Sequence, residues 1–204
     1  YCEMLLRKAF PKVSLNITNP FFQNFIKKRI NMMYQSKSNK YSLLRYSVGI
    51  IAIAILDFAA QYFVHYLLHK VKWMWRFHIV HHSDTMVDAT TGTRHHPGDY
   101  AMREVFALGA IVLTGIPIAY YFFYRIITVF FAYFTHANIN MPLKVDKAMS
   151  YVFVTPNMHK FHHHYELPWT DTNFGNIFSC WDRIFGTFVY GDPKQVKYGL
   201  DITD

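Results

Sequence analysis

The sequence predicts an all-α fold: an integral-membrane helical bundle with a cytosolic, histidine-rich cap. Two apolar segments, residues 46–68 and 105–134, are each long enough to cross about 30 Å of hydrocarbon as helices. Charged residues make up only 17% of the 204 residues, whereas a soluble domain usually carries about 25%. The twelve histidines lie mainly between the apolar segments or at their ends, which places them in the cap. The length suits one domain with one core.

The charge balance favours a membrane partner over nucleic acid. The chain has 21 Lys and Arg residues against 13 Asp and Glu, a net charge of +8. The cations are scattered and often stand beside apolar runs, as at residues 27–29 and at Lys70, Lys72 and Arg76. This arrangement suits anionic lipid headgroups. The chain shows no basic helix or basic-aromatic module, so we expect no nucleic-acid partner.

Cysteine chemistry adds little. Cys2 and Cys180 are far apart in sequence, and neither belongs to a CxxC pair. A disulfide framework, a thiolate zinc site and an iron–sulfur cluster therefore lack support. The chain begins at Tyr1 and shows no signal peptide, and we expect its N-terminus to be truncated.

We expect three parts along the chain. Residues 1–45 form a basic, weakly amphipathic segment, residues 46–190 a membrane-embedded domain, and residues 191–204 a C-terminal tail. Within the first part, residues 19–34 suit a helix that lies flat on a membrane with its apolar face down. An ordinary surface helix is the alternative for that stretch.

The first apolar segment carries a polar stripe. Asp57, Gln61, His65 and His69 follow one another at steps of four, which places them along one side of a helix. Polar groups inside such a segment are costly and usually face a bundle interior or a site. We therefore expect a membrane helix whose stripe faces inward, with an amphipathic helix of a soluble core as the alternative.

The second apolar segment is too long for one crossing. As a single helix, residues 105–134 would extend about 45 Å, and His136 would lie across the membrane from His96. Gly115 and Pro117 stand near the middle and can turn the chain. We therefore predict a helical hairpin that enters the membrane and returns, so that the histidines before and after it act together.

The histidines follow a repeated pattern. His65 and His69 read HxxxH, and residues 78–82 and 159–163 each read HxxHH. Positions i, i+3 and i+4 share one helix face, so we expect each HxxHH to present three imidazoles to one side. Neutral imidazole binds iron, zinc and copper. One four- to six-coordinate ion cannot use them all, so we expect two metal ions. The candidate ligands are His65, His69, His78, His81, His82, His96, His136, His159, His162 and His163.

For several metal-dependent reactions, the sequence lacks the further residues that the reaction requires. Zinc hydrolysis usually adds a general base, but no HExxH or HxxEH is present. Zinc deaminases want cysteine ligands and an HxE motif, which are missing. Haem held by two histidines needs far fewer imidazoles. Two irons fit better, because they can activate O2 and take a hydrogen from the unactivated C–H bonds of a lipid chain.

The ordered motifs resemble those of the fatty acid hydroxylase/sterol desaturase superfamily, which are integral-membrane, non-haem di-iron oxygenases. The resemblance extends from Asp57 to Thr187 and covers "DFAAQYFVHYLLH", "WRFHIVHHSD", "DATTGTRHHPGD", "FTHANI", "TPNMHKFHHH" and "TNFGNIFSCWDRIFGT". The chain departs from the usual pattern at Tyr66, Asp88 and Phe174, which leaves substrate details open.

The resemblance implies metal ligands at the eight histidines of the three motifs, with His96 and His136 as additions. His95 and His164 have no clear counterpart in the superfamily. Carboxylates behind the ligands can orient the rings and offset the metal charge. The candidates for that role are Asp57, Asp84, Asp88, Asp171 and Asp182.

The predicted function is O2-dependent hydroxylation of a sterol, fatty-acyl or related lipid at two iron ions. Desaturation at the same centre is an alternative, and a histidine-rich membrane zinc protein, a transporter or hydrolase, is another. Zinc can also occupy the iron positions in purified protein. The chain has no flavin, nicotinamide or iron–sulfur motif, so we expect a separate redox protein to donate electrons. The "HPGD" stretch at 96–99 approaches a haem motif, which we interpret as coincidence.

Overall fold

The computed structural model describes residues 27–28 and 40–200. The chain falls into two compact units, Tyr1–Arg45 and Tyr46–Asp204. Most of the first unit lies outside the described residues, as do residues 201–204. Of the amphipathic stretch expected at 19–34, only residues 27–28 are described. The site discussed below belongs to the second unit.

The first apolar segment forms one long run of helix. It consists of α3 (Lys40–Asp57), a π-helical turn η1 (Phe58–Phe63) and α4 (Val64–Lys70). The π turn widens the helix in the middle of the polar stripe, a feature common at functional sites. The stripe is buried as expected: the Asp57 side chain is fully enclosed, and the His69 side chain is 1% exposed.

Helix α5 (Lys72–His82) follows α4 after a break at Val71, whose backbone is extended. A short 3₁₀ turn, η2 (Thr91–Thr93), then leads to the second apolar segment. Helices α4 and α5 together carry five of the expected metal ligands.

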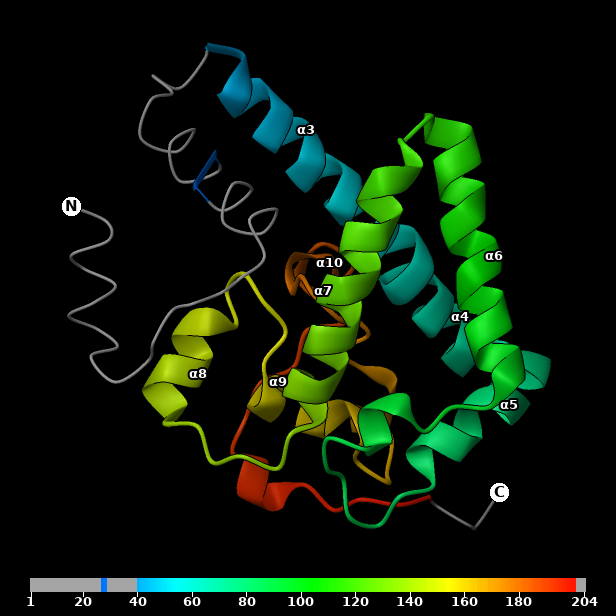
Figure 1. Ribbon diagram of the computed structural model, residues 1–204. Coiled ribbons are helices and arrows are strands. Elements are labelled where there is room, and N and C mark those ends of the chain that lie inside the picture. Colours follow the sequence, from blue (N-terminus) through cyan, green and yellow to red (C-terminus); the bar gives the residue numbers. More distant parts are fainter. Residues whose placement is uncertain (1–26, 29–39, 201–204) are drawn as a thin grey trace, which may run out of the picture. The chain divides into compact units, whose positions relative to one another are not determined.

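The two helices and the turn of the predicted hairpin are confirmed. Helices α6 (Pro97–Thr114) and α7 (Ile118–His136) run in opposite directions from a shared turn and spread apart toward their other ends (Figure 1). Gly115 takes a left-handed backbone conformation, with φ 68°, that glycine adopts without steric cost, and Pro117 then caps α7. The turn returns His136 to the end of the bundle that holds α5, as expected.

The hairpin presents an apolar outer surface. Leu113 is 88% exposed and Val112 81% exposed, and Phe122 and Phe130 of α7 are also exposed. Two helical runs, Leu43–Lys70 and Ile118–His136, are long and apolar enough to cross a membrane. An apolar surface of this kind is unfavourable in water and favourable in lipid.

The remaining chain folds over the cap end of these helices. It contains α8 (Leu143–Met149), α9 (Pro156–His162), η3 (Trp169–Asp171), α10 (Cys180–Ile184) and η4 (Pro193–Gln195). Two isolated bridges join Phe153 to Phe178 and His164 to Tyr198, and residues 40–200 contain no strand. The all-α prediction is confirmed for this part of the chain.

A core cluster joins the long helices to this C-terminal layer. Leu56 and Ala60 of the first run pack with Ala107 of α6, Tyr124 of α7 and Ile177. Side chains from four separate stretches therefore meet in one cluster, which packs these helices against the C-terminal layer.

Candidate metal centre

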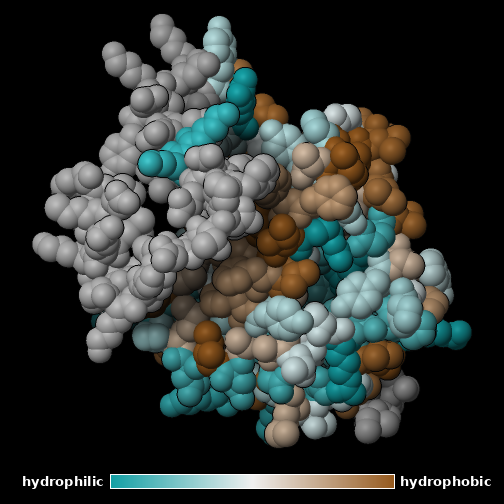
Figure 2. All heavy atoms as spheres, viewed as in Figure 1, coloured by the Kyte–Doolittle hydropathy of each residue, from teal (hydrophilic) through white to brown (hydrophobic). Residues whose placement is uncertain are grey.

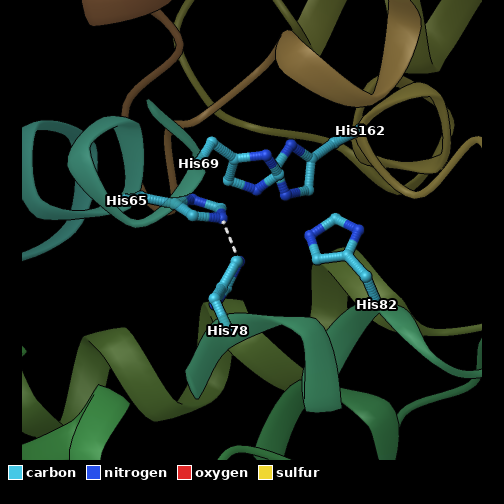
Figure 3. Close-up of side chains that lie close together, drawn as sticks. All are labelled: His65, His69, His78, His82 and His162. Atoms are coloured by element: carbon cyan, nitrogen blue, oxygen red, sulfur yellow. Dashed lines mark hydrogen bonds between the residues drawn. The ribbon is translucent and has the colours of Figure 1, made fainter. Parts of the chain in front are cut away.

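The structure brings nine of the ten expected ligands together in two adjoining groups. The five-histidine group comes from α4, α5 and α9, and its rings point toward one another in Figure 3. The four-histidine group comes from α5, α7 and α9. Within each group the nearest ring nitrogens lie within 4.8 Å of one another. The five-histidine group is His65, His69, His78, His82 and His162; the four-histidine group is His81, His136, His159 and His163.

Each HxxHH motif is divided between the groups, which corrects the expectation that its three imidazoles face one side. His78 and His82 join the five-histidine group, whereas His81 joins the other. Successive residues of a helix point about 100° apart around its axis, so neighbouring histidines diverge. In the second motif, which lies on α9 and ends at its C-cap His163, the division is the reverse, with one ring in the five-histidine group and two in the other.

The two groups touch through these divided motifs. The rings of His82 and His163 stack with centroids 4.6 Å apart, and those of His162 and His163 meet edge to face at 5.3 Å. Two ions held by the groups would therefore be neighbours in one centre.

Most outward ring nitrogens of the five-histidine group are held by hydrogen bonds. His65 Nδ1 donates to the Phe174 carbonyl at 2.8 Å, and His162 Nδ1 donates to the Thr172 carbonyl at 2.7 Å. Carboxylates accept from the other two: Asp99 from His78 Nδ1 at 2.6 Å, and Asp171 from His69 Nδ1 at 3.2 Å. Because Nδ1 carries the proton in each case, Nε2 is left with a lone pair that points inward.

The inward nitrogens have the geometry of an ion site. In the four-histidine group, His136 Nδ1 donates to the Ala132 carbonyl at 2.7 Å. Its Nε2 lies 3.1 Å from His81 Nε2 and 3.0 Å from the Nε2 atoms of His159 and His163. Four buried imidazole nitrogens cannot all satisfy one another by hydrogen bonds, and a shared cation would satisfy them.

The five-histidine group also contains buried ring nitrogens without hydrogen-bond partners. The Nε2 atoms of His69, His82 and His162 are buried and have no hydrogen-bond partner. A neutral nitrogen donor set of this kind suits iron or zinc, so the residues present fit the metals that the sequence predicts.

Burial keeps the histidines uncharged. Desolvation lowers the pKa of His78 to about 3, despite the opposing effect of Asp99. Desolvation, followed by the repulsion of neighbouring rings, lowers the pKa of His81, His82 and His163 well below 6.5. At neutral pH these side chains are therefore free bases, the form that binds metal.

Asp99 orients one of the grouped rings, although it was not among the carboxylates predicted for that role. Its buried carboxylate accepts from His78 and also from His95 Nδ1 at 2.8 Å, while Arg103 donates to its other oxygen at 2.7 Å. The "HPGD" stretch contains this residue, and its i, i+4 spacing to both His95 and Arg103 on the start of α6 was the available signal.

His96 is not brought into either group, which corrects its expected place among the ligands. Its exposed ring caps α6 by accepting from the Gly98 amide at 3.0 Å, and it packs on Phe77. His95 occupies the inward position instead, stacked on His81 with ring centroids 4.0 Å apart. The chain turns into α6 at this point, so adjacent side chains face opposite ways.

Four of the five carboxylates expected behind the ligands hydrogen-bond no histidine. Asp84 instead accepts from the Thr91 hydroxyl and from Arg94. Asp57 accepts from the backbone of Ile177 and Phe178, and from Trp181 Nε1 at 3.1 Å, and so fastens α3 to the C-terminal layer. Exposed Asp88 accepts only from its neighbour Thr90.

Asp182 contacts no ring directly but binds the backbone of a loop that does. It accepts from the Phe174 and Gly175 amides at 2.7 and 3.0 Å. Because the Phe174 carbonyl accepts from His65, Asp182 fixes the loop that orients this ring. His164 lies outside both groups, where its Nδ1 donates to the Lys197 carbonyl at 3.0 Å.

The fold and the two histidine groups together define a class: all-α proteins with a buried, histidine-only centre at one end of an apolar helical hairpin. The chain belongs to the fatty acid hydroxylase family, whose sequence model matches residues 50–187. That match covers all nine grouped histidines.

Curated relatives cover the same region. The chain is 28% identical over 154 residues to ornithine lipid hydroxylase OlsE of Rhizobium tropici, covering 76% of this chain and 45% of that protein. It is 26% identical over 145 residues to the human alkylglycerol monooxygenase, covering 71% and 31%. It is also 26% identical over 154 residues to cholesterol 25-hydroxylase-like protein 1, member 2, of Danio rerio, covering 72% and 54%.

The chain therefore spans about a third to a half of the length of these relatives. No solved structure matches it.

Proposed function

We propose that this chain is an O2-dependent lipid hydroxylase with two iron ions, one in each histidine group. The observation that carries the proposal is the convergence of buried, uncharged imidazole nitrogens in two adjoining groups. The printed names of the relatives, which are lipid hydroxylases and monooxygenases, support the reaction class. Bound there, the irons would supply O2 activation and removal of a hydrogen from a lipid C–H bond.

The chain's own residues prepare the ligands for this chemistry. Asp99, Asp171 and the Phe174 carbonyl hold the rings of three ligands in the tautomer that points Nε2 inward. Such outer partners commonly change metal affinity about 10–100-fold when removed. Burial excludes water, which protects a reactive centre from side reactions.

We propose that the hairpin and the first helical run embed the protein in a membrane with the histidines on the cytoplasmic side. The exposed apolar surface of α6 and α7 supports the embedding. Lys70, Lys72 and Arg76 stand on α4 and α5 at the histidine end, and an excess of such cations marks the cytoplasmic side of membrane proteins. A separate redox protein would then deliver electrons from that side.

Desaturation at the same centre remains the nearest alternative. Both reactions begin with removal of a hydrogen, and the later steps depend on sub-ångström positioning of the lipid. A mass gain of one oxygen in lipids from cells that make the protein would identify hydroxylation. A loss of two hydrogens would identify desaturation instead.

Metal analysis of anaerobically purified protein tests the centre itself. We expect about two irons per chain, since each histidine group offers enough ligands for one ion. His81→Ala and His162→Ala alter different groups, so each variant should lose about one iron. His96→Ala, which alters neither group, is the matched control and should keep both. One zinc per chain without O2 consumption would contradict the proposal and favour a zinc protein.

A further inference from the structure

His81 belongs to the four-histidine group, but its outward nitrogen makes no hydrogen bond. Its Nε2 lies 3.1 Å from His136 Nε2, on the inner side of the group. Its Nδ1 is buried without a hydrogen-bond partner. Hydrogen-bond partners behind a histidine usually fix the tautomer and the direction of a ring that binds metal. The His81 ring therefore depends on packing for its orientation.

The ring of His95 supplies that packing contact. It stacks on the His81 ring nearly in parallel, with the ring centroids 4.0 Å apart and an interplanar angle of 12°. Tyr100 meets the His95 ring edge to face at 5.1 Å, and the His95 side chain is only 10% exposed. The His95 ring is therefore confined against His81 by its neighbours.

A buried carboxylate fixes His95 in turn. Asp99 accepts from His95 Nδ1 at 2.8 Å through Oδ2, the same oxygen that accepts from His78 Nδ1 at 2.6 Å. Its other oxygen accepts from Arg103 at 2.7 Å, and Arg103 Nη1 also donates to Gln61 at 2.7 Å. The carboxylate is therefore held from both sides.

Asp99 thus reaches a ring of each histidine group. It accepts directly from His78 of the five-histidine group, and His95 connects it to His81 of the other group. A carboxylate that accepts from an imidazole N–H raises the basicity of that ring. An ion held by His81 would make its ring more positive, and a positively polarised group is stabilised over an electron-rich ring. The stack therefore favours the metal-bound form of His81.

We propose that His95 is a positioning residue for the four-histidine group, because it holds His81 by stacking and links that ring to Asp99. One carboxylate then serves a ligand in each group. This inference rests on the proposed two-ion centre and adds a residue to it. It does not depend on which lipid is oxidised.

Titration of the metal-free full chain with Co2+ tests the inference. Co2+ binds imidazole sites, and its visible absorption reports the geometry of its ligands. The protein would be kept in lipid nanodiscs, since α6 and α7 present hydrophobic surfaces (Figure 2). His162→Ala removes a ligand of the five-histidine group and so reports the four-histidine group, whereas His81→Ala reports the five-histidine group. Competition with a chelator gives the dissociation constants.

The two backgrounds should respond differently to His95→Ala. Beside His162→Ala, it should weaken Co2+ binding about three- to tenfold, as expected for loss of one ring contact, and shift the Co2+ absorption bands. Beside His81→Ala, it should leave Co2+ binding unchanged, since His95 then has no ligand to stack on. His96→Ala, which alters the neighbouring exposed ring, is the matched control and should change neither group.

A second variant separates the stack from the hydrogen bond and serves if His95→Ala fails to fold. His95→Phe keeps an aromatic ring against His81 and removes the donor to Asp99, so it should also weaken the four-histidine group. Asp99→Asn should weaken that group when His95 is present, and should add nothing to His95→Phe, because the link is already cut.

Three results would overturn the inference. The first is an unchanged affinity of the four-histidine group in either His95 variant. The second is an equal loss of affinity in both groups, which would indicate general damage to the fold. The third is that the effects of Asp99→Asn and His95→Phe on the four-histidine group simply add.

A lipid product assay separates this inference from the proposed function. Two irons per chain and Co2+ binding that depends on His95, without any O2-dependent product, would contradict the proposed function and support the positioning role. An oxidised lipid product, with Co2+ binding that does not depend on His95, would leave the proposed function standing and overturn the inference.

Discussion

The two histidine groups differ in how firmly the protein holds them. In the five-histidine group, four rings donate outward hydrogen bonds, two of them to the carboxylates of Asp99 and Asp171. In the four-histidine group, no carboxylate contacts a ring, and the Nδ1 atoms of His81 and His159 are buried without a partner. Protein contacts therefore orient four of the five rings in the first group, but fewer of the rings in the second.

The two groups also differ in how many of their rings face a cavity. A cavity of about 80 Å³ lies beside the two groups, and it is lined by three histidines of the four-histidine group but by one of the five in the other group. Metal sites that react keep open positions, whereas structural sites are closed. Under the proposed function, the four-histidine group would therefore be the one that faces a substrate.

The largest expected effect is that of His136→Ala. His136 Nε2 is the common neighbour of the other three rings in its group, so its loss removes the central ligand. We expect product formation to fall by more than the about 10–100-fold typical of outer partners, with about one iron lost per chain. Iron analysis beside a lipid product assay checks both. Retention of both irons would contradict the role given to this ring.

Asp99→Asn tests the support of the five-histidine group. The change weakens the acceptor for His78 and leaves the buried Arg103 without its counter-charge. We expect metal affinity to fall about 10–100-fold and the free energy of unfolding to decrease. Competition with a chelator measures the affinity. Asp88→Asn, which alters an exposed carboxylate bonded only to Thr90, is the control and should change neither quantity.

Acidification tests the uncharged state of the histidines. In the metal-free protein the pKa of His78 is about 3 and that of His82 lies well below 6.5, whereas histidines of the unfolded chain titrate near 6.5. Below that pH the unfolded chain binds more protons, so the free energy of unfolding should fall as the pH drops from about 6.5 toward about 3. Chemical unfolding of metal-free protein at several pH values measures this. A gain in stability on acidification would contradict the burial.

Asp171→Asn should have the smallest effect on the centre. Its carboxylate is 25% exposed, accepts from His69 at the longer distance of 3.2 Å and is shared with Lys70. We expect a loss of metal affinity below that of Asp99→Asn, by a few-fold, since solvent weakens an exposed interaction. An effect as large as that of Asp99→Asn would show that exposure does not separate the two carboxylates.

The sequence by itself determined the type of fold and nearly all of the candidate ligands. The length and apolarity of the two segments predicted helices, and Gly115 with Pro117 predicted the hairpin, because these are local properties of the backbone. The HxxxH and repeated HxxHH spacings identified eight of the nine grouped histidines for the same reason. The four-step stripe from Asp57 to His69 predicted which side of the first helix is buried.

Only the tertiary structure decided how those ligands are shared and supported. His81 joins a different group from His78 and His82, because its side chain points in another direction from the helix axis. Rings from α7 and from the segment around α9 complete the four-histidine group. His95, and not His96, faces inward because of the turn into α6.

The supporting contacts join residues far apart in the chain. His65 donates to the Phe174 carbonyl, 109 residues away, and Asp57 accepts from Ile177, 120 residues away. Helical spacing relates residues three or four apart, so it cannot predict which carboxylate or carbonyl meets a given ring once distant segments pack together.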